Sequence, residues 1–371
     1  MMNMKFSCER ALLLAGVQAA SKTVAVKSTI PALEGLLLTV DDELVISGYN
    51  LKTGIRTRIP VEVQETGAIV LNARLFGEIV RRMSDDVVTF STDANGLVRL
   101  SCGMSRFEIM GTGAADFPEL PEVDATGGIK VPENKLKSLI GETLFAVSDN
   151  ETRPIYMGSL FETSGSVLTV VSVDGFRLAL RREKLERECA DLSFVVPGST
   201  LTEVERLCSD TDDEVSVALG SRHIMFTIGN TEVISRRLEG EFLDYKRTVS
   251  NPPKYIVTCD RRGLIEAVDR VSLIINEKVR SPLRFMFDTN QIFISCATAL
   301  GQASDEVSAA GDGEGLEIGF NNRYMLDALK AAPADELAIQ LVNNVSPCII
   351  VPADGSDGFL YMILPVRIRE K

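Results

Sequence analysis

A long internal repeat is the feature that most constrains the fold of this 371-residue chain. Three similar blocks occupy residues 35–59, 158–182 and 282–306, and they begin 123 and 124 residues apart. Each block has the pattern of an apolar strand, a short turn and a β-branched strand. The turns fall at Asp41-Asp42, Ser164-Gly165 and Asp288-Thr289-Asn290. These residue types accept turn dihedrals or bond their own backbone, so the blocks predict one β-hairpin that occurs three times.

Two further series of segments follow the same period. Strands that lead into helices begin at Val70, Val195 and Ile318, which are 125 and 123 residues apart. Residues able to cap these helices are Asn72, Ser199, and Asn321 or Asn322. Strand-to-helix segments of a similar kind cover residues 4–17, 129–142 and 255–268. Both series place apolar side chains at helical spacing, so the repeated unit contains two helices among its strands.

The length of the repeat determines what kind of unit it is. A period of about 124 residues is far longer than a solenoid repeat, so each unit should be a domain with its own core. Pro and Gly interrupt the pattern in 115–128 and 247–255, which favours domain boundaries there. We therefore predict an α+β chain of three tandem domains, at residues 1–125, 126–252 and 253–371.

The composition is that of globular domains. The chain is 45% hydrophobic and 25% charged, which is enough to build a core in each domain. No apolar run approaches the roughly 20 residues of a membrane span. Residues 11–22 look like the apolar region of a signal peptide, but Glu9 and Arg10 precede them, and Gly16 and Gln18 interrupt them. We predict an amphipathic helix there and a cytoplasmic protein.

Metal and disulfide chemistry are not indicated. The seven cysteines are scattered without CxxC spacing, and the single histidine, His223, lies in a strand-like segment. Reduced thiols in the core are therefore expected, with no metal site and no disulfide framework. The carboxylates of "SDTDDE" (209–214) match the spacing of metal ligands poorly and have the pattern of a loop.

Catalytic motifs are equally sparse. The best candidate for a cofactor site, "GTGAAD" (111–116), is followed by "FPELPEV". Two prolines exclude the helix that a dinucleotide fingerprint needs directly after its glycines. A Ser-His-Asp site would depend on His223 alone. We predict a protein that is not an enzyme and has no cofactor; an enzyme that uses 111–116 is the most distant alternative. The net charge of −13, taken globally, also argues against nucleic acid.

The chain ends on an apolar segment, "GFLYMILPVRIREK" (358–371). Chain ends are usually polar, and Pro365 argues against a central strand because proline cannot donate to a ladder. One interpretation is an edge strand that packs on the core. The other is one wall of a peptide-binding groove, because an exposed apolar patch with a polar rim often marks a docking surface.

The whole chain resembles the bacterial sliding clamps, the beta subunits of the replicative DNA polymerase. The resemblance rests on "DGFRLAL" (174–180) and "LPVRI" (364–368), set on the threefold repeat. Further similar segments are "MKF" (4–6), "IPALEGLLL" (30–38), "SRFEI" (105–109), "ADFPEL" (115–120), "EFLDYKR" (241–247), "NEKVR" (276–280) and "EIGFNNRYMLDAL" (317–329). A single DGxRLA motif is a weak signal, whereas this ordered set is specific.

The resemblance implies an architecture and a function. Two chains would join head to tail as a homodimer and form a ring of six domains, with sheets outside and helices lining the hole. Such a ring is a processivity factor that encircles duplex DNA without reading its sequence. It tethers the replicative polymerase, the clamp loader and repair proteins through short peptides, and it implies no membrane partner. The main alternative is a DNA-independent toroidal scaffold that binds short linear peptides.

A ring reconciles an acidic chain with DNA, because only the helix faces at the hole need positive charge. Two such segments carry net charges of +2 (Arg74, Glu78, Arg81, Arg82) and +1 (Arg261, Arg262, Glu266, Asp269, Arg270). Residues that the resemblance places at DNA are Lys27, Arg74, Asn150 and, as a weaker candidate, Arg153. Pro154-Ile155 and Gly198-Ser199 depart from the paired tyrosines and the basic pair that family members carry there, so those contacts are in doubt.

The resemblance also places a peptide-binding groove between the DGxRLA turn and the final strand. Its residues are Tyr156, Val173, Gly175, Phe176, Arg177, Leu178, Leu243, Arg247, Thr248, Pro347, Met362, Ile363, Leu364, Pro365, Val366 and Arg367. Phe176, Leu243 and Pro347 stand where family members frequently have His, Pro and Ser. We expect the groove to persist with a shifted peptide preference, and a polar group of the peptide to meet the rim near Arg177 or Met362.

The interface that closes the ring is expected between the edge strand "SRFEIM" (105–110) of one chain and the third domain of the other. The candidate interface residues are Arg106, Phe107, Ile109, Leu273 and Ile274. Phe107 and Ile109 alternate onto one face of the strand. Heterologous contacts that close a ring leave no strand edge unpaired, which protects the assembly from further association.

Overall fold

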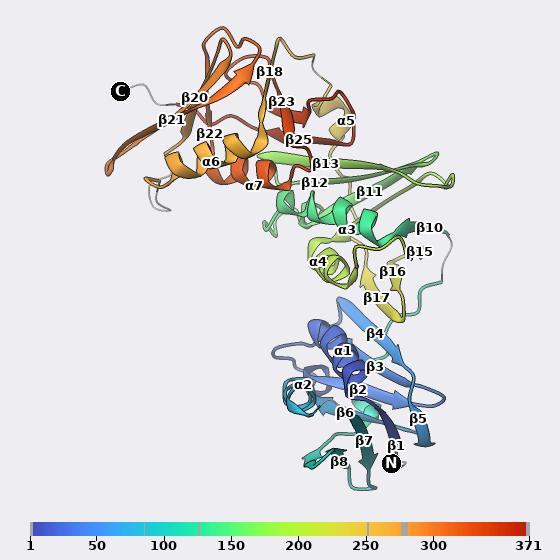
Figure 1. Cartoon of the computed structure of the whole chain (residues 1–371). Helices are drawn as coiled ribbons and strands as arrows, with labels where there is room; N and C mark the ends of the chain where they lie inside the picture. The colour runs from blue at the N-terminus through green and yellow to red at the C-terminus, as the bar shows by residue number, and fades with distance from the viewer. Residues whose placement is uncertain (1–2, 85, 125–126, 251, 276–280, 369–371) are drawn as a thin grey trace. The chain divides into compact units, whose positions relative to one another are not determined.

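The computed structural model of the chain (Figure 1) describes residues 3–84, 86–124, 127–250, 252–275 and 281–368. Contacts divide the chain into two compact units. Unit 1 comprises Met1–Leu136 and Glu203–Arg237, and unit 2 comprises Lys137–Thr202 and Leu238–Lys371. The predicted first domain belongs to unit 1, the third to unit 2, and the middle one contributes to both. The segment "NEKVR" (276–280) lies outside the described residues.

Unit 1 contains two antiparallel sheets. The smaller sheet has the order β5-β1-β7-β8-β9. Its strands are β1 (Lys5–Glu9), β5 (Glu62–Glu65), β7 (Val87–Thr92), β8 (Leu97–Cys102) and β9 (Ser105–Met110). The larger sheet has the order β10-β15-β16-β17-β4-β3-β2-β6. Its strands are β2 (Gly35–Val40), β3 (Leu44–Tyr49), β4 (Thr53–Ile59), β6 (Gly67–Asn72), β10 (Gly127–Pro132), β15 (Glu214–Leu219), β16 (His223–Ile228) and β17 (Thr231–Arg236). Because β17 pairs with β4, strands of two domains form one continuous sheet.

The first domain adds two helices to these strands, α1 (Arg10–Ala20) and α2 (Ala73–Arg82). Both are amphipathic, as the sequence predicts, and bury one apolar stripe each. Leu13 and Val17 of α1 and Phe76 and Val80 of α2 are almost fully buried in one core with the strands. The exposed face of α2 carries Arg74, Arg81 and Arg82, whereas that of α1 is mostly small or apolar, with Ala11, Leu12 and Ala15 beside Gln18.

Unit 2 contains one long antiparallel sheet. Its order is β14-β11-β12-β13-β25-β24-β23-β18-β21-β20-β19-β22. Its strands are β11 (Gly158–Ser164), β12 (Val167–Val173), β13 (Arg177–Lys184), β14 (Leu192–Pro197), β18 (Tyr255–Asp260), β19 (Leu283–Asp288), β20 (Gln291–Thr298), β21 (Gly301–Ala310), β22 (Leu316–Phe320), β23 (Glu336–Leu341), β24 (Cys348–Pro352) and β25 (Phe359–Ile363). Here β25 of the third domain pairs with β13 of the middle domain, as β17 pairs with β4 in unit 1.

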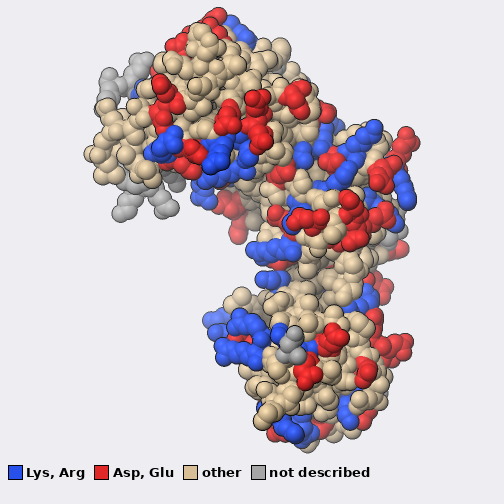
Figure 2. All heavy atoms as spheres, in the orientation of Figure 1, with Lys and Arg blue, Asp and Glu red and all other residues tan. Residues whose placement is uncertain are grey.

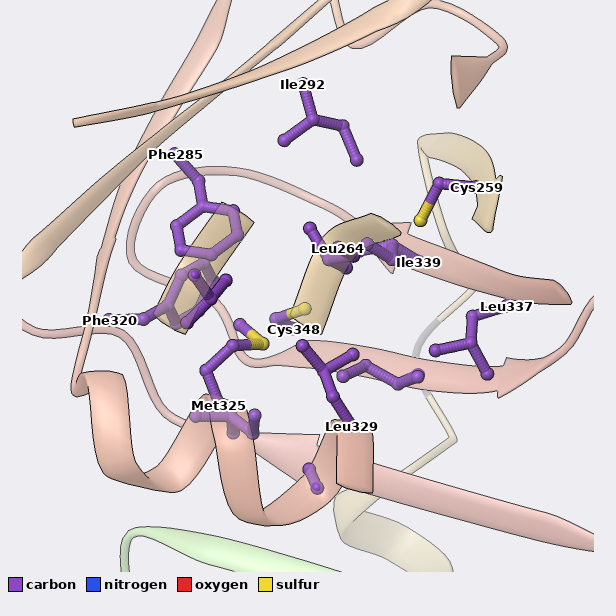
Figure 3. Packing of buried hydrophobic residues seen from close by; sticks show 14 of the residues in the cluster. Cys259, Leu264, Phe285, Ile292, Phe320, Met325, Leu329, Leu337, Ile339 and Cys348 are labelled. Carbon is purple, nitrogen blue, oxygen red and sulfur yellow. The ribbon is translucent and has the colours of Figure 1, made fainter. Parts of the chain in front are cut away.

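Two neighbouring helices, α6 (Arg261–Ser272) and α7 (Asn322–Ala331), pack on the third-domain part of this sheet. Figure 3 shows side chains of the shared core, where Phe320 of β22 lies against Phe285 of β19 and Met325 of α7 points toward them. The remaining α-helices are α3 (Glu133–Gly141), α4 (Gly198–Leu207) and the short α5 (Tyr245–Thr248). Short 3-10 helices are η1 (Ser21–Thr23), η2 (Pro31–Glu34), η3 (Ala114–Asp116), η4 (Leu144–Ala146) and η5 (Pro154–Met157).

The observed elements confirm the threefold repeat of hairpins and helices. The hairpins β2-β3, β11-β12 and β19-β20 turn where the sequence predicts. Two helix caps also agree: the backbone N–H of Leu75 donates to Asn72 Oδ1 (2.9 Å), and the N–H groups of Arg323 and Tyr324 donate to Asn321 Oδ1. The Ser199 cap was predicted wrongly, because α4 already begins at Gly198 and Ser199 lies within it.

Candidate peptide-binding groove and basic helix faces

The apolar end of the chain forms both a strand and a tail. The last strand, β25, lies between β13 and β24, with Met362 opposite Leu178 on one side and Ile349 on the other. The strand ends at Ile363, and residues 364–368 continue as a tail. The edge-strand interpretation was wrong for residues 359–363, because this strand has a partner on each side. That the tail after it forms one wall of a peptide-binding groove stays a prediction. Pro365 lies in the tail, where no ladder bond is lost.

An apolar cluster surrounds the start of this tail. Val173, Leu178 and Met362 are buried at its base, and Tyr156, Leu243 and Leu364 pack on it half-buried. These six predicted groove residues come from four separate stretches of the chain. Residues of the cluster that the predicted groove lacks are Ile155, Leu160, Val171, Leu180, Val195, Leu238, Phe242, Tyr245, Val249, Ile349, Val351 and Leu360. They lie mostly on strand interiors and carry no motif that distinguishes them from ordinary core.

Exposed side chains surround this apolar base. Phe176 is 60% exposed and Val366 is 40% exposed, which is unusual for large apolar residues. Gly175, Arg247 and Arg367 are also exposed. Thr248 and Pro347 line a small hollow together with Ile349 of the cluster. The predicted set thus combines a buried apolar cluster, exposed apolar side chains at its margin and a small hollow at Thr248, Pro347 and Ile349, a combination that suits apolar side chains of a peptide.

The turn before β13 is rigidly shaped. Gly175 adopts a left-handed conformation (φ 92°), which glycine accepts without strain. Asp174 Oδ1 accepts hydrogen bonds from the N–H groups of Phe176 (2.9 Å) and Arg177 (3.1 Å). These local bonds fix the backbone of the turn that carries Phe176.

Two predicted groove residues direct their side chains away from the apolar cluster. Ile363 is fully buried and belongs to the third-domain core, on the opposite face of β25 from Met362. Adjacent residues of a strand point to opposite faces, so the two cannot both face the groove. Ile363 contributes only its backbone pairing with Arg177.

Arg177 is the second such residue, because its side chain points inward and is only 8% exposed. Its Nε donates to Asp174 Oδ2 (2.8 Å) and its Nη1 donates to Asp327 Oδ2 (2.6 Å). The guanidinium also lies 4.4 Å from the ring centroid of Tyr324 and 5.4 Å from that of Phe145. Its hydrogen-bonding capacity is therefore used within the protein, and the expected role at the rim is replaced by one in holding the turn.

Aromatic contacts that the sequence did not predict support the groove. The ring of Phe176 stacks on Tyr324 of α7, with centroids 6.2 Å apart. The ring of Tyr156 meets Phe242 edge-on at 5.6 Å. Both are offset or T-shaped arrangements, which aromatic rings prefer. In the sequence, Tyr324 stands out only because it lies in the family-like segment 317–329. That position does not show that its ring contacts Phe176.

A buried polar contact fixes the segment that joins the middle and third domains. Tyr245 donates from its hydroxyl to Glu162 Oε2 (2.6 Å). Burial and this carboxylate raise the pKa of Tyr245, so the phenol stays protonated at neutral pH. The bond holds α5 against the face of β11, beside the apolar cluster.

The helix α2 presents a basic face. Arg74, Arg81 and Arg82 are exposed, and Glu78 pairs with Arg81 (2.7 Å) and Arg82 (3.2 Å). Within the described part of the chain Arg74 forms no ion pair. Figure 2 shows Lys and Arg side chains gathered where Figure 1 places α2, around a small acidic spot. This face is suited to nonspecific contact with phosphates.

The helix α6 is basic to a smaller degree. Arg262 and Arg270 pair with Glu266 on the helix, and Arg270 donates from Nε to Asp305 of β21 (2.6 Å). Arg261 lies 3.7 Å from Asp335. Figure 2 accordingly shows both signs of charge over the region of α6. Its positive potential is weaker than the sequence count suggests, because carboxylates beyond the helix also approach it.

The other predicted DNA residues are exposed on loops. Lys27 lies in the loop before η2 in unit 1. Asn150 and Arg153 lie before η5 in unit 2. Asn150 Oδ1 accepts from the N–H and hydroxyl of Thr152, so this side chain mainly shapes its own turn. Pro154 begins η5, a position that proline favours.

The predicted interface residues lie at a sheet edge and a helix end. Strand β9 is the last strand of its sheet, with Arg106 exposed and with Phe107 and Ile109 half-buried against the first-domain core. Leu273, directly after α6, is 82% exposed, whereas Ile274 packs partly on the third-domain core. Strand β21 pairs with β18 only at Ala309 and Ala310, so most of one edge of β21 has no strand partner among the described residues.

The remaining chemical candidates have ordinary structural settings. Residues 111–116 form a bridge to Val70 and the short η3, followed by extended chain. His223 begins β16, where burial and two arginines lower its pKa. In the described residues, no group of three or more His, Cys, Asp or Glu side chains could hold a metal ion. None of the helices in this described part is long and apolar enough to cross a membrane.

Comparisons with known proteins cover nearly the whole chain. Three domains described as the N-terminal, central and C-terminal domains of the DNA polymerase III beta subunit match residues 4–121, 130–244 and 247–367. The beta sliding clamp of Staphylococcus epidermidis is 30% identical over 98% of this chain and 99% of its own.

Solved structures agree with this result. The DNA polymerase sliding clamp of Bacillus subtilis is 30% identical, with a TM-score of 0.95 over 99% of this chain and 100% of its own. The sliding clamp of Pseudomonas aeruginosa bound to griselimycin is 29% identical, with a TM-score of 0.93 over 99% and 100%. The chain therefore belongs to the family of DNA polymerase III beta subunits, the beta sliding clamps, whose members are processivity factors and not polymerising enzymes.

Proposed function

We propose that this protein works in the cytoplasm as a DNA sliding clamp, a homodimeric ring that encircles duplex DNA and tethers replication and repair proteins by short peptides. The observation that carries the proposal is the groove beside the tail. It joins buried Leu178 and Met362 to exposed Phe176 and Val366 in a chain whose three domains all match the family.

The groove can account for partner binding at useful strength. A short peptide that places two or three apolar side chains on the cluster removes apolar area from water, at about 25 cal/mol per Å². After the peptide's ordering cost, a gain of several kcal/mol remains, which corresponds to roughly micromolar affinity. Affinity of that order suits partners that exchange on one ring.

The DNA contacts proposed for Lys27, Arg74, Asn150 and Arg153 are few and exposed. The protein as a whole is strongly acidic, with a net charge of −13, so its outer surface repels DNA. Binding therefore depends on encirclement, with weak phosphate contacts that fade as salt rises.

A dimer is required to close such a ring from three-domain chains. Exposed Leu273 and the edge of β9 supply the proposed contact, and the edge of β21 offers a partner for β9. Ring closure would pair two strand edges that otherwise invite aggregation. Leu273→Ala with Ile274→Ala should give folded monomers, as measured by sedimentation at low concentration; a persistent dimer would place the interface elsewhere.

The decisive test of encirclement compares circular and linear DNA. After loading onto nicked circles, the wild-type protein should be retained through gel filtration and released when a restriction enzyme linearises the circle. Equal retention on both forms, or tight sequence-selective binding to short duplexes, would refute the clamp. A dimer that binds peptides but is never retained on circles would indicate the DNA-independent scaffold.

The groove is tested by Leu364→Asp, which brings a charge to an apolar wall with little change in volume. The variant should remain dimeric but lose griselimycin binding and polymerase stimulation. Leu51→Asp is the matched control, because Leu51 is an exposed leucine outside the groove (53% exposed). If Leu364→Asp binds griselimycin as tightly as Leu51→Asp does, the tail is not part of the site.

A further inference from the structure

The tail that forms one wall of the groove is held by two backbone hydrogen bonds. The N–H of Leu364 donates to the carbonyl of Phe176 (2.8 Å), and the N–H of Val366 donates to the carbonyl of Gly319 (2.8 Å). Pro365, between them, has no N–H to donate. The first bond fixes the tail to the turn before β13, and the second fixes it to the edge strand β22.

Gly319 permits the second attachment because it lacks a side chain. A Cβ atom built on Gly319 would lie 2.5 Å from the carbonyl oxygen of Val366 and 2.8 Å from Cγ1 of Ile368. The first of these atoms is backbone, so it cannot swing aside as a flexible side chain would. The φ angle of Gly319 is not in the left-handed region. Glycine is therefore needed here for the close approach of the tail, and not for an unusual backbone conformation.

The strand β22 cannot yield to relieve such a clash. Ile318 and Phe320, on either side of Gly319, are almost fully buried in the third-domain core. Phe320 meets Phe285 edge-on, with ring centroids 5.3 Å apart. Figure 3 shows the two rings side by side. Along β22, residues from Leu316 to Phe320 also pair with β19. A side chain at position 319 would therefore displace the tail, because the tail is the less constrained partner.

Displacement would be confined to one wall of the groove. Met362 and Ile363 are paired with β13 and β24, so the floor stays in place. Leu364 also keeps its own bond to the carbonyl of Phe176. The groove would thus keep its floor and Leu364, and lose the orientation of Val366.

We propose that Gly319 is a positioning residue for partner binding, which fixes the tail as a groove wall while touching no partner itself. This proposal rests on the proposed function of the groove. It assigns a role to the edge of β22, which lies outside the predicted groove residues.

The test substitutes Gly319→Ala and measures griselimycin binding by fluorescence titration on the intact dimer. Overpacking at this contact should weaken binding by about tenfold. Gly113→Ala is the matched control, because a Cβ at Gly113 meets nothing within 4 Å. Hydrogen exchange supplies a readout that general destabilisation would not reproduce: the Val366 amide should exchange faster in Gly319→Ala, while the Met362 amide keeps its protection.

A second variant covers the case in which Gly319→Ala does not fold. Ile368→Ala removes the side chain that packs over Gly319 and leaves β22 unchanged. It should weaken griselimycin binding in the same direction, though less, and also speed exchange at Val366.

The outcomes separate the two proposals. Wild-type affinity together with wild-type Val366 exchange in the folded variants would overturn the role of Gly319. Faster Val366 exchange with unchanged affinity would also overturn it, since the tail would then be irrelevant to binding. If the wild-type protein itself does not bind griselimycin, the proposed groove fails, while the exchange data still decide whether Gly319 holds the tail.

Discussion

The two domain junctions of this chain can be compared residue by residue, because an equivalent strand pair joins the domains at each. In unit 2, Leu178 of β13 lies opposite Met362 of β25, and Leu180 lies opposite Leu360. In unit 1, the corresponding pairs are Gly54–Ile234 and Arg56–Glu232. The two junctions share the same backbone pairing, but the side chains on the paired residues differ.

The junction in unit 1 is covered by charge and by its own connecting segment. Glu232 lies 3.6 Å from Arg56 and 2.8 Å from Arg58. Above Gly54 lies Leu120, whose Cδ2 would be 2.8 Å from a Cβ at that glycine. Leu120 thus occupies space that a leucine fills at the other junction. The hollow at the unit 1 junction is lined by charged as well as apolar side chains, among them Arg56, Arg58 and Glu232, whereas the apolar cluster of unit 2 lies beside an exposed apolar tail.

This difference shows that the repeated backbone alone does not make a binding groove. A few positions decide it, since Leu180 and Leu360 form an apolar face where Arg56 and Glu232 form an ion pair. Covering an ion pair with an apolar peptide would remove the charges from water, so it would contribute little binding free energy. We therefore expect griselimycin to bind at the junction in unit 2 and not at that in unit 1.

The largest effect should come from Leu178→Ala, because Leu178 is fully buried. Its truncation should lower the free energy of unfolding by about 2–5 kcal/mol and open a hole in the groove floor. Urea unfolding and griselimycin titration measure the two effects. Leu120→Ala, at the covered junction, should cost stability but leave griselimycin affinity unchanged. Equal loss of affinity in both variants would mean that the junctions do not differ as proposed.

Arg177→Lys should lower stability less than Leu178→Ala, because the positive charge is kept. The position is one where the junctions differ, since unit 1 has the uncharged Thr53 there. Lysine lacks the planar fork that directs separate N–H groups to Asp174 and Asp327, and it does not stack on Tyr324 in the same way. The free energy of unfolding should fall by about 1–3 kcal/mol, measured by urea denaturation. Arg247→Lys, at an exposed position, serves as the control. An unchanged free energy of unfolding in Arg177→Lys would contradict the anchoring role of this side chain.

Glu232→Gln should have a modest effect that is confined to unit 1. Its ion pairs with Arg56 and Arg58 are partly exposed to water, so their loss should cost no more than about 1 kcal/mol of the free energy of unfolding. The difference from wild type should shrink as salt rises from low ionic strength. Griselimycin affinity should not change, and a clear loss would link the unit 1 surface to the groove.

The smallest effect concerns His223, the only histidine of the chain. Burial lowers its pKa, and the nearby Arg236 and Arg222 lower it further. The unfolded chain therefore binds a proton more readily than the folded one, so stability should fall as the pH drops below about 6.5. The NMR titration of this single ring should have its midpoint below the ordinary histidine value. A midpoint at or above that value would show that the charges at this junction do not reach His223.

Much of the fold could be predicted from spacing alone. The period of the hairpins, the amphipathic helices α1 and α2 and the cap at Asn72 all follow from local rules, because backbone propensity and side-chain periodicity act over a few residues. The domain boundaries stay predictions, since the contacts of the chain divide the middle domain between two units. Val173, Leu178, Met362 and Leu364, which the resemblance assigns to the groove, meet in one cluster, and their role in peptide binding stays a prediction.

By itself, the sequence determined the threefold α+β repeat, its turns and helices, and the family to which the chain belongs. Only the tertiary structure decided that Arg177 turns inward to Asp327, 150 residues away, and that Ile363 faces the core. It also decided that Gly319 receives the tail and that Leu120 covers Gly54. The physical reason is that each of these contacts depends on strand register and on which face a side chain takes. Register is set by the packing of whole sheets, which no short segment of the sequence specifies.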